Sequence, residues 1–150
     1  MRAGSRLRGE RGTALIEVTW LSLLLLVPLV YVVLSVFAVQ RAAFAMDAAT
    51  RAAGRAYVLA PSQDAGVARA RAAAAVALQD QGLRMADGSF SASCSPRPDD
   101  CLTPGSVVHV AMAYRVDLPL VPDALGRDAP SIRVQADHSV PYGSFREARP

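Results

Sequence analysis

The chain has 150 residues, enough for one modest domain and a short additional element but too few for two ordinary domains. Its hydrophobic content of 52% exceeds that of a typical soluble domain, and the excess lies near the N-terminus. The net charge of +3 is also local, because residues 1–12 hold four arginines and one glutamate, whereas residues 40–150 hold 12 arginines and 11 acids. Since no basic stripe is interleaved with aromatic residues, we exclude nucleic acid as a partner.

An apolar run without a charged residue extends over 22 residues, from Val18 to Val39. As a helix it would be about 33 Å long, against a bilayer hydrocarbon core of about 30 Å. We therefore predict a transmembrane helix over residues 13–39. The basic leader, residues 1–12, predicts a single-pass protein with a cytoplasmic N-terminus and an extracytoplasmic body. Within the run, Pro28 removes one backbone hydrogen bond and predicts a kink.

A basic start followed by an apolar run is also typical of a secretory signal peptide, which is removed from the mature protein. Apolar regions of signal peptides usually run about 7–15 residues, so this run is longer than expected. Small residues at a cleavage spacing do follow, at Val36 and Ala38 and at Ala43 and Ala45. A secreted product therefore stays open as an alternative, whereas the lack of a cysteine near the end of the run argues against a lipoprotein.

The helical pattern continues beyond the run, because residues 40–60 are rich in alanine and contain no proline. We predict one helix over about Thr13–Val58, in which residues 40–60 project as an extracytoplasmic stalk. The expected packing stripe of the stalk is Phe37, Phe44, Ala48 and Tyr57, and its expected solvated residues are Arg41, Arg51 and Arg55.

Residues 61–150 are expected to form a small extracytoplasmic domain that opens with a second helix. Ser62 is the expected N-cap of this helix, Asp64 lies in its first turn, and Gly82 follows its end. Its expected inner face consists of Val67, Ala70, Ala74 and Leu78.

Strand patterns follow the second helix. The clearest alternation places Val108, Val110, Met112, Tyr114, Val116 and Leu118 on one side of a strand. Weaker strands are expected around Phe90, Ala92 and Cys94, and around Ile132, Val134, Ala136 and Val140, with residues 119–130 as a proline-rich loop. The predicted fold class is therefore α+β: a long transmembrane helix that continues as a stalk, a second helix, and a small three-stranded antiparallel sheet covered by the second helix or the stalk.

Cys94 and Cys101 flank six turn-forming residues, and in an oxidising compartment such a pair predicts a disulfide bond. A zinc site that adds His109 and His138 is the weaker interpretation, because the spacing lacks a close C-x-x-C pair. Asp99 and Asp100 are expected to form a solvated turn, since this loop displays too few oxygen ligands for calcium. We expect no metal and no cofactor.

Catalysis needs convergent polar groups, and the chain has two histidines and none of the common hydrolase or phosphate-binding motifs. His138 shares the apolar side of its strand with Val134 and Val140, so we expect it to be partly buried and hydrogen-bonded. His109 lies on the more polar side of its strand, where we expect it to be solvated. We predict that the protein is not an enzyme.

Glu17 stands at the very start of the apolar run, five residues after Gly12. The simpler interpretation is an interfacial acid that is favoured by the positive end of the helix dipole. The functional interpretation is that cleavage after Gly12 creates an amino terminus at Thr13, which could pair with a glutamate of a neighbouring helix in the low-dielectric bilayer. This pairing would favour side-by-side assembly in one axial register.

These features resemble the N-terminal signal of class III prepilins, and residues 8–60 look like the TadE family of the tight-adherence pilus system, in which an "RG…ALVEF" pattern opens a single membrane helix. The resemblance implies a pilin-like minor pilin or pseudopilin that a prepilin peptidase cleaves between Gly12 and Thr13, with Glu17 as the acid of the motif. The implied partners are the lipid bilayer, other pilin-like subunits and the platform proteins of pilus assembly. The alternative is a single-pass anchor that carries an extracytoplasmic binding domain unrelated to pili.

Overall fold

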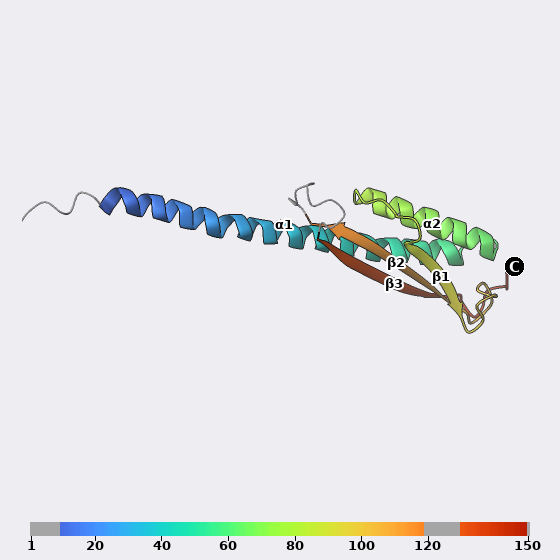
Figure 1. Cartoon of the computed structure of the whole chain (residues 1–150). Helices are drawn as coiled ribbons and strands as arrows, with labels where there is room; N and C mark the ends of the chain where they lie inside the picture. Colours follow the sequence, from blue (N-terminus) through green and yellow to red (C-terminus); the bar gives the residue numbers. More distant parts are fainter. Residues whose placement is uncertain (1–9, 119–129, 150) are drawn as a thin grey trace, which may run out of the picture.

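The computed structural model describes residues 10–118 and 130–149, with side chains described from Leu15 onward (Figure 1). Two helices precede three strands: α1 (Glu10–Val58), α2 (Gln63–Asp80), β1 (Phe90–Ser95), β2 (Val107–Asp117) and β3 (Ser131–Pro141). The strands form one antiparallel sheet, so the α+β class expected from the sequence is confirmed. The predicted loop over residues 119–130 lies outside the described residues except for Pro130.

One uninterrupted helix of 49 residues, α1, runs through the whole N-terminal part of the described chain. It ends at Val58 as predicted, and its start at Glu10 comes three residues before the predicted Thr13. The helix continues through Pro28, where the missing amide hydrogen removes a single backbone bond from a long ladder. The predicted transmembrane segment and the stalk are therefore parts of one continuous helix.

The two halves of α1 have different surroundings, as Figure 1 shows. From Leu15 to Val30 every side chain is exposed, and this half extends alone as a rod. From Ala42 onward one face of the helix is buried beneath α2 and the sheet. We call this second part, together with α2 and the sheet, the head.

The buried face of the stalk consists mainly of small residues, and the predicted stripe is wrong at three of its four positions. Phe37 and Phe44 are 63% and 76% exposed, and Ala48 is exposed as well, whereas Tyr57 is buried as expected. The aromatic rings lie on the outer side because the inner side has to let two other elements come close. The buried residues are Ala42, Ala45, Met46, Ala49, Thr50, Ala53, Tyr57 and Val58.

The closest approach of the sheet to α1 occurs at Gly54. A Cβ atom built on this glycine would lie 2.6 Å from Cγ2 of Val140 and 3.6 Å from Cδ2 of His138. Real Cβ atoms do not approach other atoms to 2.6 Å, so the sheet could not take this position against any larger residue. Gly54 therefore sets the distance between the stalk and β3.

The second helix begins as predicted, because the hydroxyl oxygen of Ser62 caps it by accepting from the amide of Ala65 at 3.3 Å. Gly82 follows its end with a φ of 70°, a left-handed conformation that suits glycine. The predicted inner face is correct except for its first residue, since Val67 is 41% exposed and Gly66 is buried in its place. The buried face of α2 is Gly66, Ala70, Ala74 and Leu78.

Gly66 replaces Val67 on that face because the ring of Tyr57 lies directly against it. A Cβ atom on Gly66 would lie 3.2 Å from the ring, which leaves no room for a valine. Burial of Tyr57, and secondarily the negative charge of Asp64, raise the pKa of its hydroxyl above the usual 10.0, so the buried ring stays neutral. The contact between α1 and α2 is thus aromatic on one side and bare backbone on the other.

The sheet has the order β1-β2-β3, and α1 covers its apolar face. Val108, Val110, Met112 and Val116 on the central strand are buried, which confirms the alternation read from the sequence. On β3, an edge strand (Figure 1), the corresponding residues Val134, Ala136 and Val140 are half-buried and Ile132 is 43% exposed. Of the two elements that were expected to cover the sheet, the stalk does so.

Two arginines bind main-chain carbonyl groups at the end of the head that is farthest from the rod. The guanidinium of Arg146 donates to the carbonyl oxygen of Val58 at 3.0 Å, and that of Arg149 donates to the carbonyl oxygen of Ala60 at 2.8 Å. Arg146 also lies over the ring of the buried Tyr142. The last carbonyls of a helix lack intrahelical partners, so Arg146 completes the C-terminal end of α1, whereas Arg149 binds the turn that follows the helix. The sequence analysis did not identify this role.

The contact at Gly54 generates a prediction about stability. We expect Gly54→Leu to lower the free energy of unfolding of the head by about 2 kcal/mol, because the added side chain would force β3 away from the stalk. Ala48→Leu, on the exposed side of the same helix, is the matched control and should change stability by less than about 0.5 kcal/mol. Thermal unfolding of the full chain in detergent measures both, and equal stabilities would contradict the proposed close contact.

Candidate functional site

The expected processing site lies at the start of α1. Gly12 and Thr13 are in the first turn of the helix, whose backbone is helical from Glu10. The first four amides of a helix have no intrahelical acceptor, so unwinding there breaks few hydrogen bonds. A peptidase could therefore reach the bond after Gly12 without disturbing the rest of α1.

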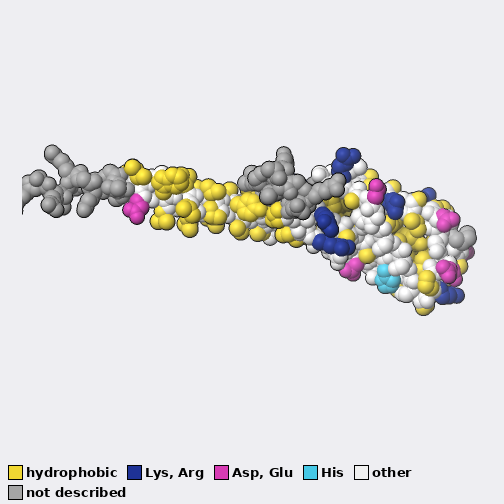
Figure 2. Space-filling model, in the orientation of Figure 1, with side chains coloured by type: hydrophobic (Ala, Val, Ile, Leu, Met, Phe, Trp, Pro, Cys, Tyr) yellow, Lys and Arg dark blue, Asp and Glu magenta, His cyan; other side chains and the backbone are white. Residues whose placement is uncertain are grey.

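Glu17 is exposed on the surface of the rod, about two turns after the start of α1. It is the only charged residue between Leu15 and Gln40, so its carboxylate marks one end of an otherwise uncharged surface. Figure 2 shows this surface as a yellow rod with magenta atoms at the end far from the head. Among the side chains that the structure describes, none forms an ion pair with the carboxylate of Glu17.

Helix α1 is long and apolar enough to cross a membrane. Its most apolar window of 18 residues has a mean hydropathy of 2.7, and no part of that window is buried in the structure. Trp20, Leu24 and Leu25 are each about 70% exposed. The rod therefore contributes nothing to the core of the head.

The outer side of the stalk is also uncovered, but its character differs from that of the rod. Arg41, Arg51 and Arg55 are exposed, as predicted, and Arg51 forms an ion pair with Asp47 one turn earlier. Phe44, between Arg41 and Arg51, is 76% exposed, and Leu59, four residues after Arg55, is 52% exposed. This mixture of cations and single apolar side chains is compatible with water, and it also offers contacts to another helix.

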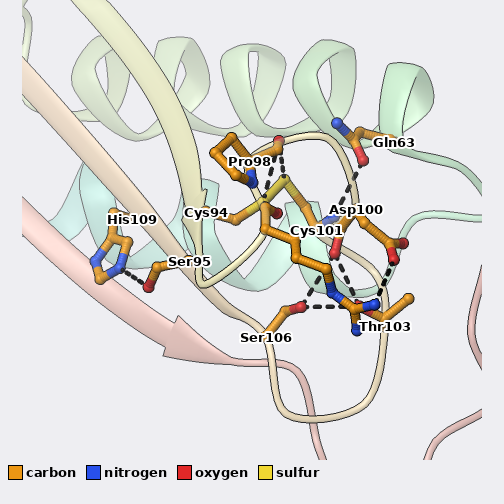
Figure 3. The surroundings of a disulfide bond; sticks show 10 residues. Gln63, Cys94, Ser95, Pro98, Asp100, Cys101, Thr103, Ser106 and His109 are labelled. Atoms are coloured by element: carbon orange, nitrogen blue, oxygen red, sulfur yellow. Dashed lines mark hydrogen bonds and ion pairs between the residues drawn. A yellow bond between two sulfur atoms is a disulfide. The ribbon is translucent and has the colours of Figure 1, made fainter.

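The predicted disulfide bond is present between Cys94, near the end of β1, and Cys101, with an S–S distance of 2.07 Å (Figure 3). The loop that it closes is attached to α2, because the amide of Cys101 donates to Oε1 of Gln63 at 3.1 Å. The loop is also attached to the start of β2, because the buried hydroxyl of Ser106 donates to the carbonyl oxygen of Asp100 at 3.0 Å. The disulfide loop thus joins β1, β2 and α2.

The two histidines have structural surroundings. The ring of His109 is half-buried and hydrogen-bonded on both sides, to the hydroxyl of Ser95 at 3.0 Å and to that of Ser139 at 2.8 Å. It links the outer strands across β2, so the prediction of a solvated ring holds only in part. Ser139 lies directly opposite His109 in the register of β3, whereas Ser95 lies two residues along β1 from Ser93, the register partner of His109. His138 is half-buried as expected, but within residues 10–118 and 130–149 its predicted hydrogen bond is not found.

A metal site is not indicated in the part of the chain that the structure describes. There, no three histidine, cysteine or acidic side chains come together as metal ligands would. Both cysteines of the alternative zinc site are used in the disulfide bond. Of the two aspartates in the loop, Asp100 lies 3.6 Å from the guanidinium of Arg97, as in a solvated turn.

The disulfide loop generates a prediction about local stability. Replacing both cysteines with serine should reduce the stability of the loop and of the adjoining end of the sheet by about 2 kcal/mol, because the unfolded chain regains the freedom of a short loop. Hydrogen exchange of the full chain should then accelerate over residues 90–110 but stay unchanged over residues 15–30. Unchanged exchange in the loop would show that the hydrogen bonds to Gln63 and Ser106 suffice.

Comparisons with protein-family models, with curated proteins and with solved structures found no match. A functional conclusion must therefore come from the chemistry of the rod, the stalk and the head.

Proposed function

We propose that this chain is a single-pass membrane subunit of the TadE-like type, a minor pilin or pseudopilin that performs no catalysis and assembles through its long helix. One observation carries the proposal: a single helix combines a completely uncovered apolar half with a half that forms the core of a small head. An assembly subunit of this design anchors itself with one half of the helix and presents the head with the other.

The uncovered half requires a non-aqueous environment. Seventeen large apolar side chains between Leu15 and Phe37 are exposed. Because transfer of each from water to an apolar phase is worth about 1.5–3 kcal/mol when complete, leaving them all in water would cost tens of kcal/mol. A lipid bilayer is the partner of matching thickness, and other apolar helices are partners within it.

The axial position of Glu17 supports assembly with a defined offset. After cleavage behind Gly12, the new amine at Thr13 would lie four residues from Glu17 of the same chain, or about 6 Å along the axis. A neighbouring copy shifted by that amount would bring its amine level with this carboxylate. The pair would be attractive inside lipid, where neither charge is stable alone.

The proposed orientation places the N-terminus in the cytoplasm and the head outside. Four arginines precede the rod, whereas the residues after it are almost balanced in charge. A disulfide bond in the head fits an oxidising compartment. In this orientation the peptidase that removes the leader would act at the cytoplasmic face.

The second candidate is a membrane-anchored binding domain with no pilus connection. The observation that favours it is an open groove on the outer side of the stalk, about 450 Å³ in volume, lined by Arg51, Ala52, Arg55, Ala56 and Leu59. Such a groove fits an apolar ligand with a negative charge. Under this candidate Gly12 and Glu17 have no special role.

Intact mass separates these candidates. We expect the native chain to begin at Thr13 and Gly12→Arg to retain residues 1–12, because a prepilin peptidase requires a small residue before the cut. Gly4→Arg, in the same leader, is the control and should mature normally. A full-length native chain would favour the plain anchor, and a chain that begins beyond Ala38 would identify a secreted protein.

The pairing of helices is tested by Glu17→Gln. Two differently tagged copies of the full chain should co-purify in mild detergent, and this variant in both copies should reduce co-purification about tenfold, because a neutral amide loses the attraction to the amine. Ser22→Ala, at another exposed polar position of the rod, should have little effect. Membrane insertion should be normal in both variants, and undiminished co-purification of the Glu17 variant would overturn the pairing model.

A further inference from the structure

Strand β3 has a neighbouring strand on one side only, because the order of the sheet is β1-β2-β3 (Figure 1). In an antiparallel pair, the backbone groups of successive residues point alternately toward the neighbouring strand and away from it. The amide of Tyr142 donates to the carbonyl oxygen of Ser106 at 2.8 Å, just beyond one end of the β2–β3 pair. The amide of Leu118 donates to that of Pro130 at 3.4 Å, just beyond the other end. Both bonds join even-numbered residues, so the even-numbered residues of β3 face β2. The residues whose backbone groups point away from the sheet are Ser131, Arg133, Gln135, Asp137 and Ser139.

These outward-facing backbone groups of residues 131–139 form what we call the free edge. Within residues 10–118 and 130–149, none of them takes part in a hydrogen bond of a turn or loop. Pro141 occupies the next outward-facing position and has no amide hydrogen, so the free edge ends before it. A row of unpaired amides and carbonyls is the template on which a further strand can pair.

A groove of about 530 Å³ lies beside the free edge, between β3 and the outer side of α1. From β3 it is lined by His138 and Val140, which face α1, since a Cβ atom on Gly54 would meet both side chains. Neighbouring strands lie about 4.8 Å apart, so a fourth strand beyond β3 would direct every second side chain into this groove. The lining residues from α1 are Asp47, Arg51, Arg55 and Val58.

The groove has a net positive charge. Arg51 and Arg55 are exposed on successive turns of α1, and Asp47 pairs with Arg51. Among the described residues, no acid forms an ion pair with Arg55. The two arginines also line the adjoining groove on the outer side of the stalk, together with Ala52, Ala56 and Leu59. A strand that fits this surface therefore carries an acidic side chain opposite the arginines and small or apolar side chains beside it.

The strands that the structure describes would not supply this acid from a second copy of the chain. The other edge strand, β1, has the sequence FSASCS and contains no acid. In β3, Asp137 precedes His138, so its side chain lies on the face of the sheet that is turned away from α1. Pairing of two β3 strands would leave this carboxylate outside the groove. The chemistry of the groove thus favours a segment of a different protein.

We propose that the free edge of β3 is a docking site for an extended acidic segment of a partner protein, which adds a fourth strand to the sheet. The backbone of the segment pairs with residues 131–139, and a carboxylate on its inward side pairs with Arg55 above the groove. Backbone pairing provides the affinity, and the buried acid selects the partner. The site uses only residues of the head, so it does not depend on cleavage after Gly12 or on pairing at Glu17.

A short peptide of alternating pattern tests the site on the full chain in detergent. The probe is the capped peptide TVTETETVT, which as a strand carries both glutamates and both valines on one face. The matched control is TVTQTQTVT, in which only the charge is removed. Each is added at about 1 mM, enough to occupy a site of millimolar affinity substantially. Hydrogen exchange of single amides is measured by NMR.

We expect the acidic peptide to slow exchange about fivefold at the amides of Arg133, Gln135 and Asp137, since alternate protection is the signature of strand addition. Ala92, whose amide points away from β2 on the opposite edge, is the internal reference and should not change. Unchanged exchange at all three positions would overturn the site. Equal protection by the glutamine peptide would overturn the acidic partner. Protection without peptide that grows with protein concentration would assign the edge to a second copy and would also overturn the proposal.

Two substitutions separate the backbone contact from the charge. Gln135→Pro removes an outward-facing amide and should abolish binding, while slow exchange at Val110 of β2 shows that the sheet is still folded. Arg55→Gln should weaken binding of the acidic peptide about threefold, whereas Arg69→Gln, on the exposed side of α2, should leave it unchanged. Native affinity in the folded proline variant would contradict strand addition, and native affinity in the Arg55 variant would contradict the proposed ion pair.

Discussion

The structure depends on the close contact between the small-residue face of the stalk and the two elements that pack on it. Alanines and Gly54 bring β3 so near to α1 that a single added carbon would collide with Val140. One turn later, the ring of Tyr57 lies against the bare backbone of Gly66 in α2. Close approach at these points buries the sheet and α2 against a helix that has few large apolar side chains of its own to offer.

Because α1 is continuous, the contact also joins the head rigidly to the rod. No proline interrupts the chain between Pro28 and Pro61, and the helix passes from the uncovered half to the packed half without a linker. In a membrane, the depth of the rod would then determine the height of the head. The proposed pairing at Glu17 acts on this same element, so a change in its axial position would also move the head.

The two ends of the head carry different kinds of side chains. At the far end, Arg146 supplies a partner for the last carbonyl of α1, and Arg149 binds a carbonyl of the turn that follows. The disulfide loop connects the sheet to Gln63 of α2. At the near end, apolar side chains and exposed arginines lie beside the rod. This difference fits a head with one end in water and the other at a lipid surface.

The sequence by itself determined the elements: the charge-free run, the alanine-rich continuation, the capping of α2 by Ser62 and the alternation on β2 all have local causes. It also determined the nearness of Cys94 and Cys101, since a short polar loop returns the chain on itself. Only the tertiary structure decided which positions on the two helices make the close contacts. Phe44 and Val67 are exposed, whereas Gly54 and Gly66 are buried. The sheet and α2 pack so closely on α1 that only the smallest residues fit at the contacts, and a pattern of hydrophobic residues does not predict this steric requirement. The bridge from His109 to two serines and the arginine contacts to the end of α1 join residues far apart in the chain, so no local pattern could predict them.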